Sequence, residues 1–210
     1  MKIMLIGGTG KTGKELIKQA LEAGHQVTAL VRNPKKIKIT NPNLVVAEGN
    51  VLVPESLERS FAAHDIVISA LGHKKFFIKT TILSGGTRNI IRAMRKNQIN
   101  RFICITSLGI NDSRFKLGLY YTFFVIPFII LFYFLDKEKQ ERIIQQSELD
   151  WTIVRPGQLT NGRKRGRYKQ GKGLGSYILT KMISRADVAH FILREMEHNA
   201  YIRKVVELTY

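Results

Sequence analysis

Short apolar runs alternate along the chain with longer segments in which apolar residues recur every three or four positions. The short runs are typical of buried parallel strands, and the longer period is typical of helices that pack against them. Strands that alternate with helices predict the α/β class with right-handed crossovers. The predicted strands are 3–6, 26–31, 44–47, 65–70, 101–106, 151–154 and 204–208, and the predicted helices are 11–23, 54–63, 79–97, 136–146 and 185–197.

This order of elements predicts one doubly wound parallel sheet, a Rossmann fold, that takes up residues 1–210 as a single domain. The strand order of such a sheet is 3-2-1-4-5-6, and a ligand lies across the carboxyl ends of strands one, four and five. No repeat, low-complexity tract or linker divides the sequence. At 210 residues, one domain of this class is long enough to bury its own core.

A glycine-rich turn, Gly7-Gly-Thr-Gly-Lys-Thr-Gly13, joins the first predicted strand to the first predicted helix. Gly7 permits a tight turn, Gly10 lets the backbone approach a pyrophosphate, and Gly13 lets the helix pack close to the strand. The phosphates are expected on the free N–H groups at the helix N-terminus. The turn therefore predicts a dinucleotide site that includes Gly7, Gly10, Lys11, Thr12 and Gly13.

Two other interpretations of the turn are weaker. A phosphate-binding P-loop needs a glycine five residues before Gly10, where the sequence has Leu5 inside the strand. A glycine turn without a ligand is the second alternative. The strand before the turn and the helix after it disfavour that alternative.

The residue after the second predicted strand distinguishes the two nicotinamide dinucleotides. An NAD site usually has an acid there, which holds the ribose 2′-hydroxyl. This chain has Arg32, followed by Asn33-Pro34-Lys35-Lys36, and no acid. A guanidinium and an ammonium suit a 2′-phosphate. The sequence thus predicts NADP (NADPH) bound by Arg32 and Lys35, with a solvated basic turn as the alternative.

The formal net charge of +18 is compatible with nucleic acid, an anionic membrane or acidic ligands. The densest basic cluster, 163–172, is interleaved with glycines and predicts a loop or hairpin. No helix-turn-helix, zinc-knuckle or aromatic RNA-binding signature accompanies it, so we expect no specific nucleic-acid partner. The histidines show no metal-ligand spacing, and we expect no metal. Cys104 lies in an apolar strand and is expected to be a buried structural thiol.

Residues 117–135 contain no charge, and Pro127 lies near their middle. Length and hydropathy alone fit a transmembrane helix. A span would, however, place parts of one sheet on opposite sides of a bilayer. We therefore expect an apolar insertion at about 115–135 that forms a buried lid over the substrate pocket. The alternatives are a flap on an anionic membrane surface and a self-association contact.

The apolar run before Gly7 is too short for a signal peptide, so a cytoplasmic protein is expected. If the flap alternative is correct, the protein is peripheral to the membrane.

Further motifs cover nearly the whole chain: Val31-Arg-Asn-Pro34, Gly49-Asn-Val51, Ser69-Ala-Leu-Gly72, Thr106-Ser107, Asp150-Trp-Thr-Ile-Val-Arg-Pro-Gly157 and Ile183-Ser-Arg-Ala-Asp-Val-Ala189. Together with the glycine turn, they resemble the atypical short-chain dehydrogenase/reductase proteins. The resemblance is to the NAD(P)H-binding group that includes NmrA-like proteins and biliverdin reductase B/flavin reductase. These motifs are specific for the group but not for a substrate.

The resemblance implies further cofactor contacts. Asn50 stands where the family usually has an acid for the adenine amino group, and its carbonyl can accept the same hydrogen bond. Residues 70–72 would line the ribose and pyrophosphate, and residues 156–158 would support the nicotinamide carboxamide. Thr106 and Ser107 would face the nicotinamide and substrate. The implied cofactor residues are Asn50, Val51, Ala70, Leu71, Gly72, Thr106, Pro156, Gly157 and Gln158.

The catalytic residues that the resemblance implies are Ser107, Tyr133 and Lys137. Typical short-chain dehydrogenases use a Tyr-x-x-x-Lys pair in which the lysine lowers the pKa of the tyrosine, so that it can protonate a carbonyl oxygen. Tyr133 and Lys137 have this spacing and share one helix face. Tyr133 lies in an apolar aromatic run, so core packing is the alternative for it.

The leading hypothesis is an NADPH-dependent oxidoreductase that transfers hydride to a small conjugated acceptor such as a flavin or quinone. Tyr120, Tyr121, Phe123 and Phe124 would stack on that acceptor. The alternative is a non-catalytic NADP(H) sensor of the NmrA kind. Nucleotide-sugar epimerisation is disfavoured because that class generally carries a larger C-terminal substrate domain.

Overall fold

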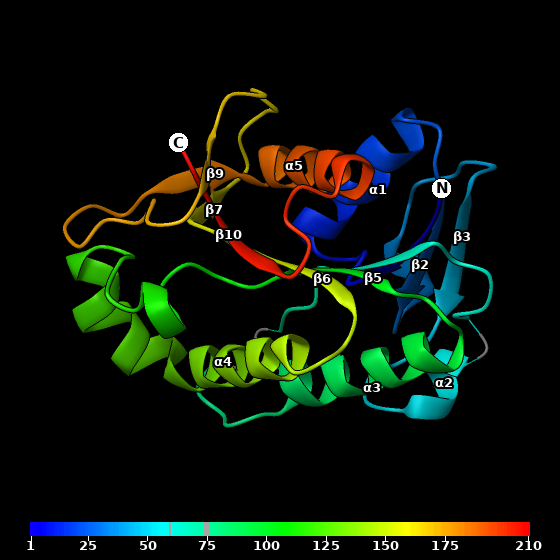
Figure 1. The fold of residues 1–210 in the computed structure, drawn as a ribbon, viewed down its shortest axis with the longest axis horizontal. Helices are drawn as coiled ribbons and strands as arrows, with labels where there is room; N and C mark the ends of the chain where they lie inside the picture. The colour runs from blue at the N-terminus through cyan, green and yellow to red at the C-terminus, as the bar shows by residue number, and fades with distance from the viewer. Residues whose placement is uncertain (59, 74–75) are drawn as a thin grey trace.

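The predicted strands assemble into a mainly parallel sheet of eight strands in the computed structural model, which describes residues 1–58, 60–73 and 76–210 (Figure 1). Its order is β3-β2-β1-β4-β5-β6-β10-β8, which confirms the predicted α/β class and the doubly wound order. β8 alone runs antiparallel to its neighbour. The strands are β1 (Lys2–Ile6), β2 (Gln26–Val31), β3 (Leu44–Glu48), β4 (Ile66–Ser69), β5 (Arg101–Ile105), β6 (Asp150–Pro156), β10 (Lys204–Thr209) and β8 (Lys169–Gly171).

Helices cover both faces of the sheet because successive strand residues point to opposite sides. Ile3 and Leu5 of β1 join the core beneath α1 and α5, whereas Met4 and Ile6 join the core on the opposite face. Figure 1 shows α1 and α5 on one side and α2, α3 and α4 on the other. The helices are α1 (Lys11–Glu22), α2 (Pro54–Glu58), α3 (Ile82–Lys96), α4 (Leu131–Gln145) and α5 (Arg185–His198).

Three helices differ from their predicted bounds by three residues or more. The helix predicted over 136–146 begins earlier, at Leu131, because it continues directly from η3. The helix predicted over 79–97 begins at Ile82, because the Asp136 carboxylate accepts hydrogen bonds from the amides of Leu83 (2.9 Å) and Ser84 (3.2 Å). A carboxylate at a helix N-terminus stabilises the start of the helix there. The helix predicted over 54–63 is shorter, since α2 ends at Glu58 and the chain then turns before β4. Arg59 lies outside the described residues.

The apolar segment 117–135 is not the buried lid that we expected. It forms a π-helix, η3 (Tyr121–Ile130), which leads directly into α4, and none of these ten described residues is buried. One side packs on a small cluster that contains Leu108 and Phe134. Because the segment is apolar all round, its other side remains exposed. No helix among the described residues is long and apolar enough to cross a membrane.

The basic segment 163–172 contributes β8 at the edge of the sheet, beside β10. Two further short strands, β7 (Gln158–Thr160) and β9 (Met182–Ser184), pair in parallel and were not predicted. Ser184 caps α5 by accepting a hydrogen bond from the amide of Asp187. Asp187 in turn accepts from the amides of Arg165 and Gly166, which ties the basic loop to the helix.

Replacing Gly13 by alanine is expected to destabilise the fold by about 1–3 kcal/mol, as overpacking does. A Cβ there would lie 2.3 Å from the Gly7 carbonyl oxygen, and moving this backbone atom away would cost conformational energy. The matched control is Gly85→Ala in α3, where the nearest atom is 3.7 Å away. That variant should be neutral or more stable by up to about 1 kcal/mol. Urea unfolding measures both, and equal stabilities would contradict the close-packing argument.

Candidate cofactor and substrate site

The glycine turn lies at the carboxyl end of β1 and packs directly on the end of β4. Gly7 has φ +84°, and a Cβ at this position would lie 2.5 Å from the Ala70 carbonyl oxygen. Gly10 precedes α1 as its N-cap residue and is exposed. Only glycine fits at positions 7 and 13, and the first amides of α1 have no helical acceptor. The structure therefore brings together the predicted pyrophosphate turn and the predicted Ala70–Gly72 wall.

The basic residues predicted for the 2′-phosphate follow the end of β2. Asn33 turns the chain by accepting a hydrogen bond from the Lys35 amide at 3.0 Å. Arg32 and Lys35 are exposed, and within the described residues neither has an ion-pair partner. Both cations are therefore available to an external anion.

The segment that contains Asn50 and Val51 lies beside the end of β2, because the Gly49 amide donates to the Val31 carbonyl at 3.0 Å. The Asn50 side-chain oxygen accepts a hydrogen bond from the Leu52 amide at 3.2 Å. An amide carbonyl has two lone pairs, so one still suits an adenine amino group. Val51 is buried, and its carbonyl accepts from Asn89 at 2.9 Å.

Tyr133 and Lys137 share one face of α4, as their spacing predicts. The Tyr133 hydroxyl reaches the end of β4, 3.4 Å from where a Cβ on Gly72 would lie. Its ring contacts His73 edge-on, with 4.8 Å between the centroids, and Phe76 at 5.6 Å. The ammonium of buried Lys137 lies 5.1 Å from the centroid of the same ring. This is a cation–π contact to the ring face.

The two polar residues predicted after β5 are already engaged. Ser107 donates to the Leu108 carbonyl at 2.9 Å and is half-buried. Thr106 is buried, and its hydroxyl donates to Glu141 at 2.6 Å. The Thr106 amide is also engaged, since it donates to the Val154 carbonyl at 2.8 Å. Cys104, on the same strand, is a buried thiol, and burial raises its pKa to about 12, which excludes a thiolate nucleophile.

The predicted carboxamide residues lie under the apolar segment. Pro156 and Gly157 are buried at the end of β6, and a Cβ on Gly157 would lie 2.5 Å from the Lys181 carbonyl oxygen. The Gln158 side-chain amide donates to the Tyr121 hydroxyl at 2.8 Å. Tyr121 therefore connects η3 with the predicted nicotinamide side of the site.

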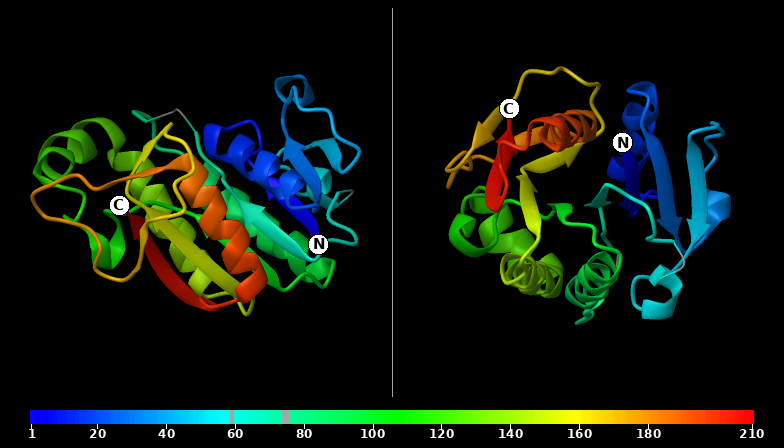
Figure 2. Two further views of the ribbon diagram at one scale, coloured as in Figure 1. Left: turned by 90° about the horizontal axis from the view of Figure 1, so that it is seen from above. Right: turned by 45° about the vertical axis from the view of Figure 1, so that its right-hand side comes forward.

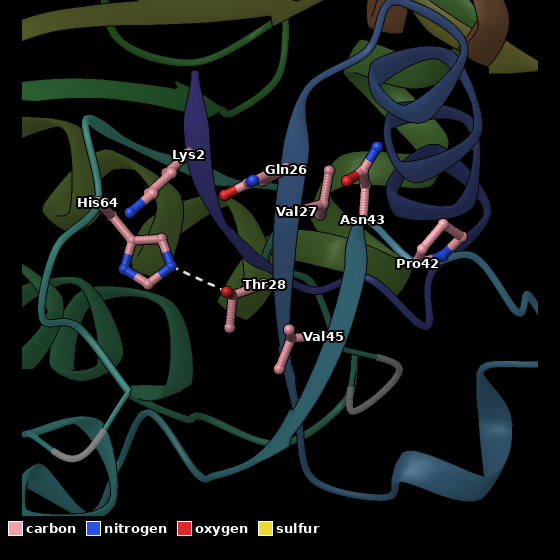
Figure 3. A pocket seen from close by; sticks show the side chains of 8 residues that line it. All are labelled: Lys2, Gln26, Val27, Thr28, Pro42, Asn43, Val45 and His64. Atoms are coloured by element: carbon pink, nitrogen blue, oxygen red, sulfur yellow. Dashed lines mark hydrogen bonds between the residues drawn. The ribbon is translucent and has the colours of Figure 1, made fainter.

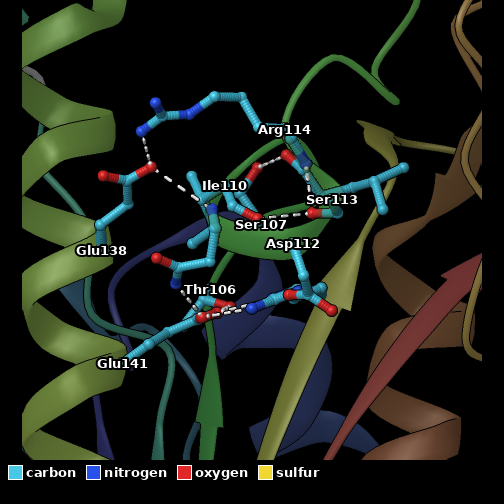
Figure 4. Close-up of polar contacts among 12 residues, drawn as sticks. Thr106, Ser107, Ile110, Asp112, Ser113, Arg114, Glu138 and Glu141 are labelled. Carbon is cyan, nitrogen blue, oxygen red and sulfur yellow. Dashed lines mark hydrogen bonds and ion pairs between the residues drawn. The ribbon is translucent and has the colours of Figure 1, made fainter.

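A buried ion pair joins the sheet to α4 at the same end (Figure 4). Arg155 on β6 donates two hydrogen bonds to Glu141, at 2.9 and 2.6 Å, and a third contact reaches Asp112. Glu141 also accepts from Asn111 at 2.6 Å. Burial opposes the charge of Arg155, but the hydrogen bonds and charges of Glu141 and Asp112 raise its pKa above the ordinary value. Such bidentate, charge-assisted contacts fix geometry.

Sequence reasoning missed this pair, although a signal was present. Arg155 interrupts an apolar strand pattern, and an arginine inside a buried strand needs an acidic partner. Glu141 lies on the preceding helix and was an available candidate. The resemblance included Arg155 in a motif without giving it a role.

One cavity lies away from this site, at the amino end of the strands (Figure 3). It measures about 230 Å³ and is lined by residues that include Lys2, Thr28 and His64, with 2.8 Å between His64 Nε2 and Thr28 Oγ1. Ligands of open α/β sheets bind at the carboxyl ends of the strands. This cavity is therefore not the dinucleotide site. The described residues also contain no cluster of His, Cys, Asp or Glu that could hold a metal.

The comparisons with known proteins agree with the fold and the glycine turn. A family model described as NAD(P)H-binding matches residues 7–199, so the chain belongs to this NAD(P)H-binding family. An uncharacterized chloroplastic protein of Arabidopsis thaliana is 30% identical over 76% of the chain. The chain spans only 60% of the length of that relative.

Solved structures show the same fold over the whole chain. The anaerobilin reductase ChuY of Escherichia coli O157:H7 has a TM-score of 0.83 at 24% identity, covering 100% of this chain and 97% of its own. A wide-type short-chain dehydrogenase/reductase of Veillonella parvula, solved in complex with NADP, has a TM-score of 0.80 at 16% identity. The match covers 100% of this chain and 94% of that one. These structures show the fold, and the family model confirms the NAD(P)H-binding family predicted from the motifs.

Replacing Glu141 by alanine is expected to lower the free energy of unfolding by about 3–5 kcal/mol, because it leaves the buried Arg155 charge unpaired. The control is Glu148→Ala, an exposed position just beyond the end of α4, where less than about 0.5 kcal/mol is expected. Urea titration measures both values. A loss below about 1 kcal/mol for Glu141→Ala would show that the pair does not hold α4 on the sheet.

Proposed function

We propose that the protein is an NADPH-dependent reductase that transfers hydride to a small conjugated acceptor of the flavin or quinone kind. The observation that carries this proposal is the convergence of two features at the carboxyl ends of β1 and β4. One is the glycine turn, and the other is the aromatic cluster of Tyr133, His73 and Phe76. A flat acceptor could pack there between a bound cofactor and the aromatic side chains.

The residues present fit a dinucleotide. The close backbone contacts at Gly7 and Gly13 keep the turn tight, so that the free amides at the N-terminus of α1 are accessible to a pyrophosphate. Arg32 and Lys35 supply cations for a 2′-phosphate. When bound, NADPH supplies the hydride. The chain orients the two ring systems and excludes water, which is sufficient for a flavin-like acceptor.

Lys137 and Tyr133 have roles at the acceptor in this proposal. The Tyr133 hydroxyl can donate a proton to an acceptor oxygen or nitrogen at the end of β4. The Lys137 ammonium over the ring stabilises negative charge that develops on the phenol oxygen. Ser107 would have to turn away from Leu108 to contact the acceptor.

Similar proteins support the proposal in two respects. The Veillonella structure contains NADP, and ChuY is described as an anaerobilin reductase. Both likenesses show the fold alone at their level of identity. The choice of NADPH over NADH and the class of acceptor come from the chain's own residues.

A non-catalytic NADP(H) sensor is the second candidate. Two observations favour it. The Ser107 hydroxyl is hydrogen-bonded to the backbone. The Lys137 ammonium contacts the face of the Tyr133 ring and not the phenol oxygen. A sensor needs the cofactor half of the site and no proton donor.

NADPH is expected to bind at least about tenfold more tightly than NADH, since a charge-assisted pair contributes about 1.5–3 kcal/mol. Arg32→Ala should remove most of this preference while NADH affinity stays unchanged. The control is Arg88→Ala on the exposed face of α3, which should leave both affinities unchanged. Calorimetric titration of the three proteins with both cofactors gives the six dissociation constants. Equal affinities of the wild type for both cofactors would refute the NADPH assignment.

Tyr133→Phe and Lys137→Met are expected to lower the turnover of flavin or quinone reduction at least about tenfold while NADPH affinity changes less than about threefold. A screen of flavins, quinones and aldehydes under NADPH provides the assay. Tight NADPH binding without turnover of any acceptor would favour the sensor instead.

A further inference from the structure

One end of the molecule exposes an unusual amount of apolar side-chain surface, which we call the apolar tip. It consists of η3 and the loop before β9, which lie side by side: the Leu119 amide donates to the Ile178 carbonyl at 3.3 Å, and the Thr180 hydroxyl donates to the Leu117 carbonyl at 3.1 Å. Both project at the end farthest from the N-terminus (Figures 1 and 2). Its most exposed side chains, 59–73% exposed, are Phe123, Phe124, Phe128, Tyr177, Ile178 and Leu179.

The chain segments that form this end contain no acidic residue. No Asp or Glu occurs between Asp112 and Asp136, or between Asp150 and Asp187, whereas nine lysines and arginines occur in the second interval. Lys116, Lys172 and Lys181 flank the apolar side chains along the chain. Along the chain, the residues that flank the apolar tip are therefore basic and none is acidic, while Asp112, which is paired with Arg155, lies near Lys172.

We propose that the apolar tip docks on an anionic lipid bilayer. Phenylalanine and tyrosine side chains enter the boundary between headgroups and acyl chains, as in interfacial helices, and the flanking lysines contact acidic headgroups. This assignment does not rest on the proposed reductase activity.

The charge pattern favours a membrane over a second copy of the chain. A two-fold dimer brings the same surface of both copies together, so the basic borders would face each other. An exposed patch of this kind needs an apolar cover, which a nucleic acid cannot supply. An anionic bilayer offers both an apolar layer and negative charge.

The insertion is shallow because the tip is fixed to the sheet. η3 continues into α4, where Asp136 accepts hydrogen bonds from the first amides of α3 and Glu141 is bonded to Arg155. Withdrawing this helix to span a bilayer would break both buried contacts. The tip therefore lies in the interface plane.

Co-sedimentation of the full chain with vesicles tests the proposal. We expect binding to phosphatidylcholine vesicles that contain about a third phosphatidylglycerol, weaker binding in high salt, and little binding to phosphatidylcholine alone. The double variant Phe124→Ser/Phe128→Ser should bind at least about tenfold more weakly. The control Ile39→Ser/Val45→Ser, at the opposite end of the sheet, should bind like the wild type.

Charge variants test the lysines separately. Lys172→Gln/Lys181→Gln is expected to weaken vesicle binding by about fivefold for each lysine, whereas the control Lys18→Gln/Lys204→Gln should have no such effect. Each variant is checked by circular dichroism and urea unfolding, so that a misfolded protein is recognised.

A reporter variant, Phe128→Trp, measures insertion directly. Trp151, the one tryptophan of the wild type, is buried, so a blue shift on adding anionic vesicles reports position 128. Absence of both vesicle binding and blue shift at low salt would overturn the proposal. A concentration-dependent dimer that the Phe124→Ser/Phe128→Ser change abolishes, without vesicle binding, would assign the tip to self-association instead.

Discussion

The substrate side of this molecule depends on the buried ion pair between Arg155 and Glu141. Both side chains are almost fully excluded from solvent, so each charge requires the other. The pair lies where β6 ends, and Thr106 at the end of β5 and Asn111 in the following loop bond to the same carboxylate. One interaction therefore sets the position of two strand ends, one loop and α4. Because α4 also carries Tyr133 and Lys137, the ion pair determines where those side chains lie relative to the glycine turn.

The cofactor side is organised differently, by backbone geometry alone. Gly7 and Gly13 leave no room for a Cβ, and the positive φ of Gly7 is costly for other residues. The constraint at Gly13 and the positive φ of Gly7 are local, since they act within one turn and one helix, and only the contact of Gly7 with the Ala70 carbonyl reaches a neighbouring strand. The two halves of the site thus differ in origin. The cofactor side is built mainly by residues close together in the sequence, whereas the substrate side is built by contacts across the sheet.

That difference explains how much could be predicted from the sequence. The strand order and the glycine turn follow from local patterns and were predicted correctly. The start of α3 at Ile82 could not be predicted locally, because it depends on Asp136, which lies far along the chain. The β7–β9 pair and β8 likewise need partners that the pattern does not identify. The apolar segment was predicted to be buried because its composition favours an apolar environment. Composition does not show, however, whether the fold has room to bury it.

η3 of the apolar tip and the part of α4 that carries Tyr133 and Lys137 form one continuous helical segment. Tyr121 near the start of η3 accepts a hydrogen bond from Gln158 on the predicted nicotinamide side, and Tyr133 near the start of α4 reaches Gly72. A bilayer that holds the exposed face of this segment would therefore hold the acceptor side of the site close to the lipid surface. Flavins reach such a site from water, whereas quinones with apolar tails concentrate in the bilayer. The two proposals taken together thus favour an acceptor that partitions into lipid, because its short path to the aromatic cluster of Tyr133 would run along the membrane interface.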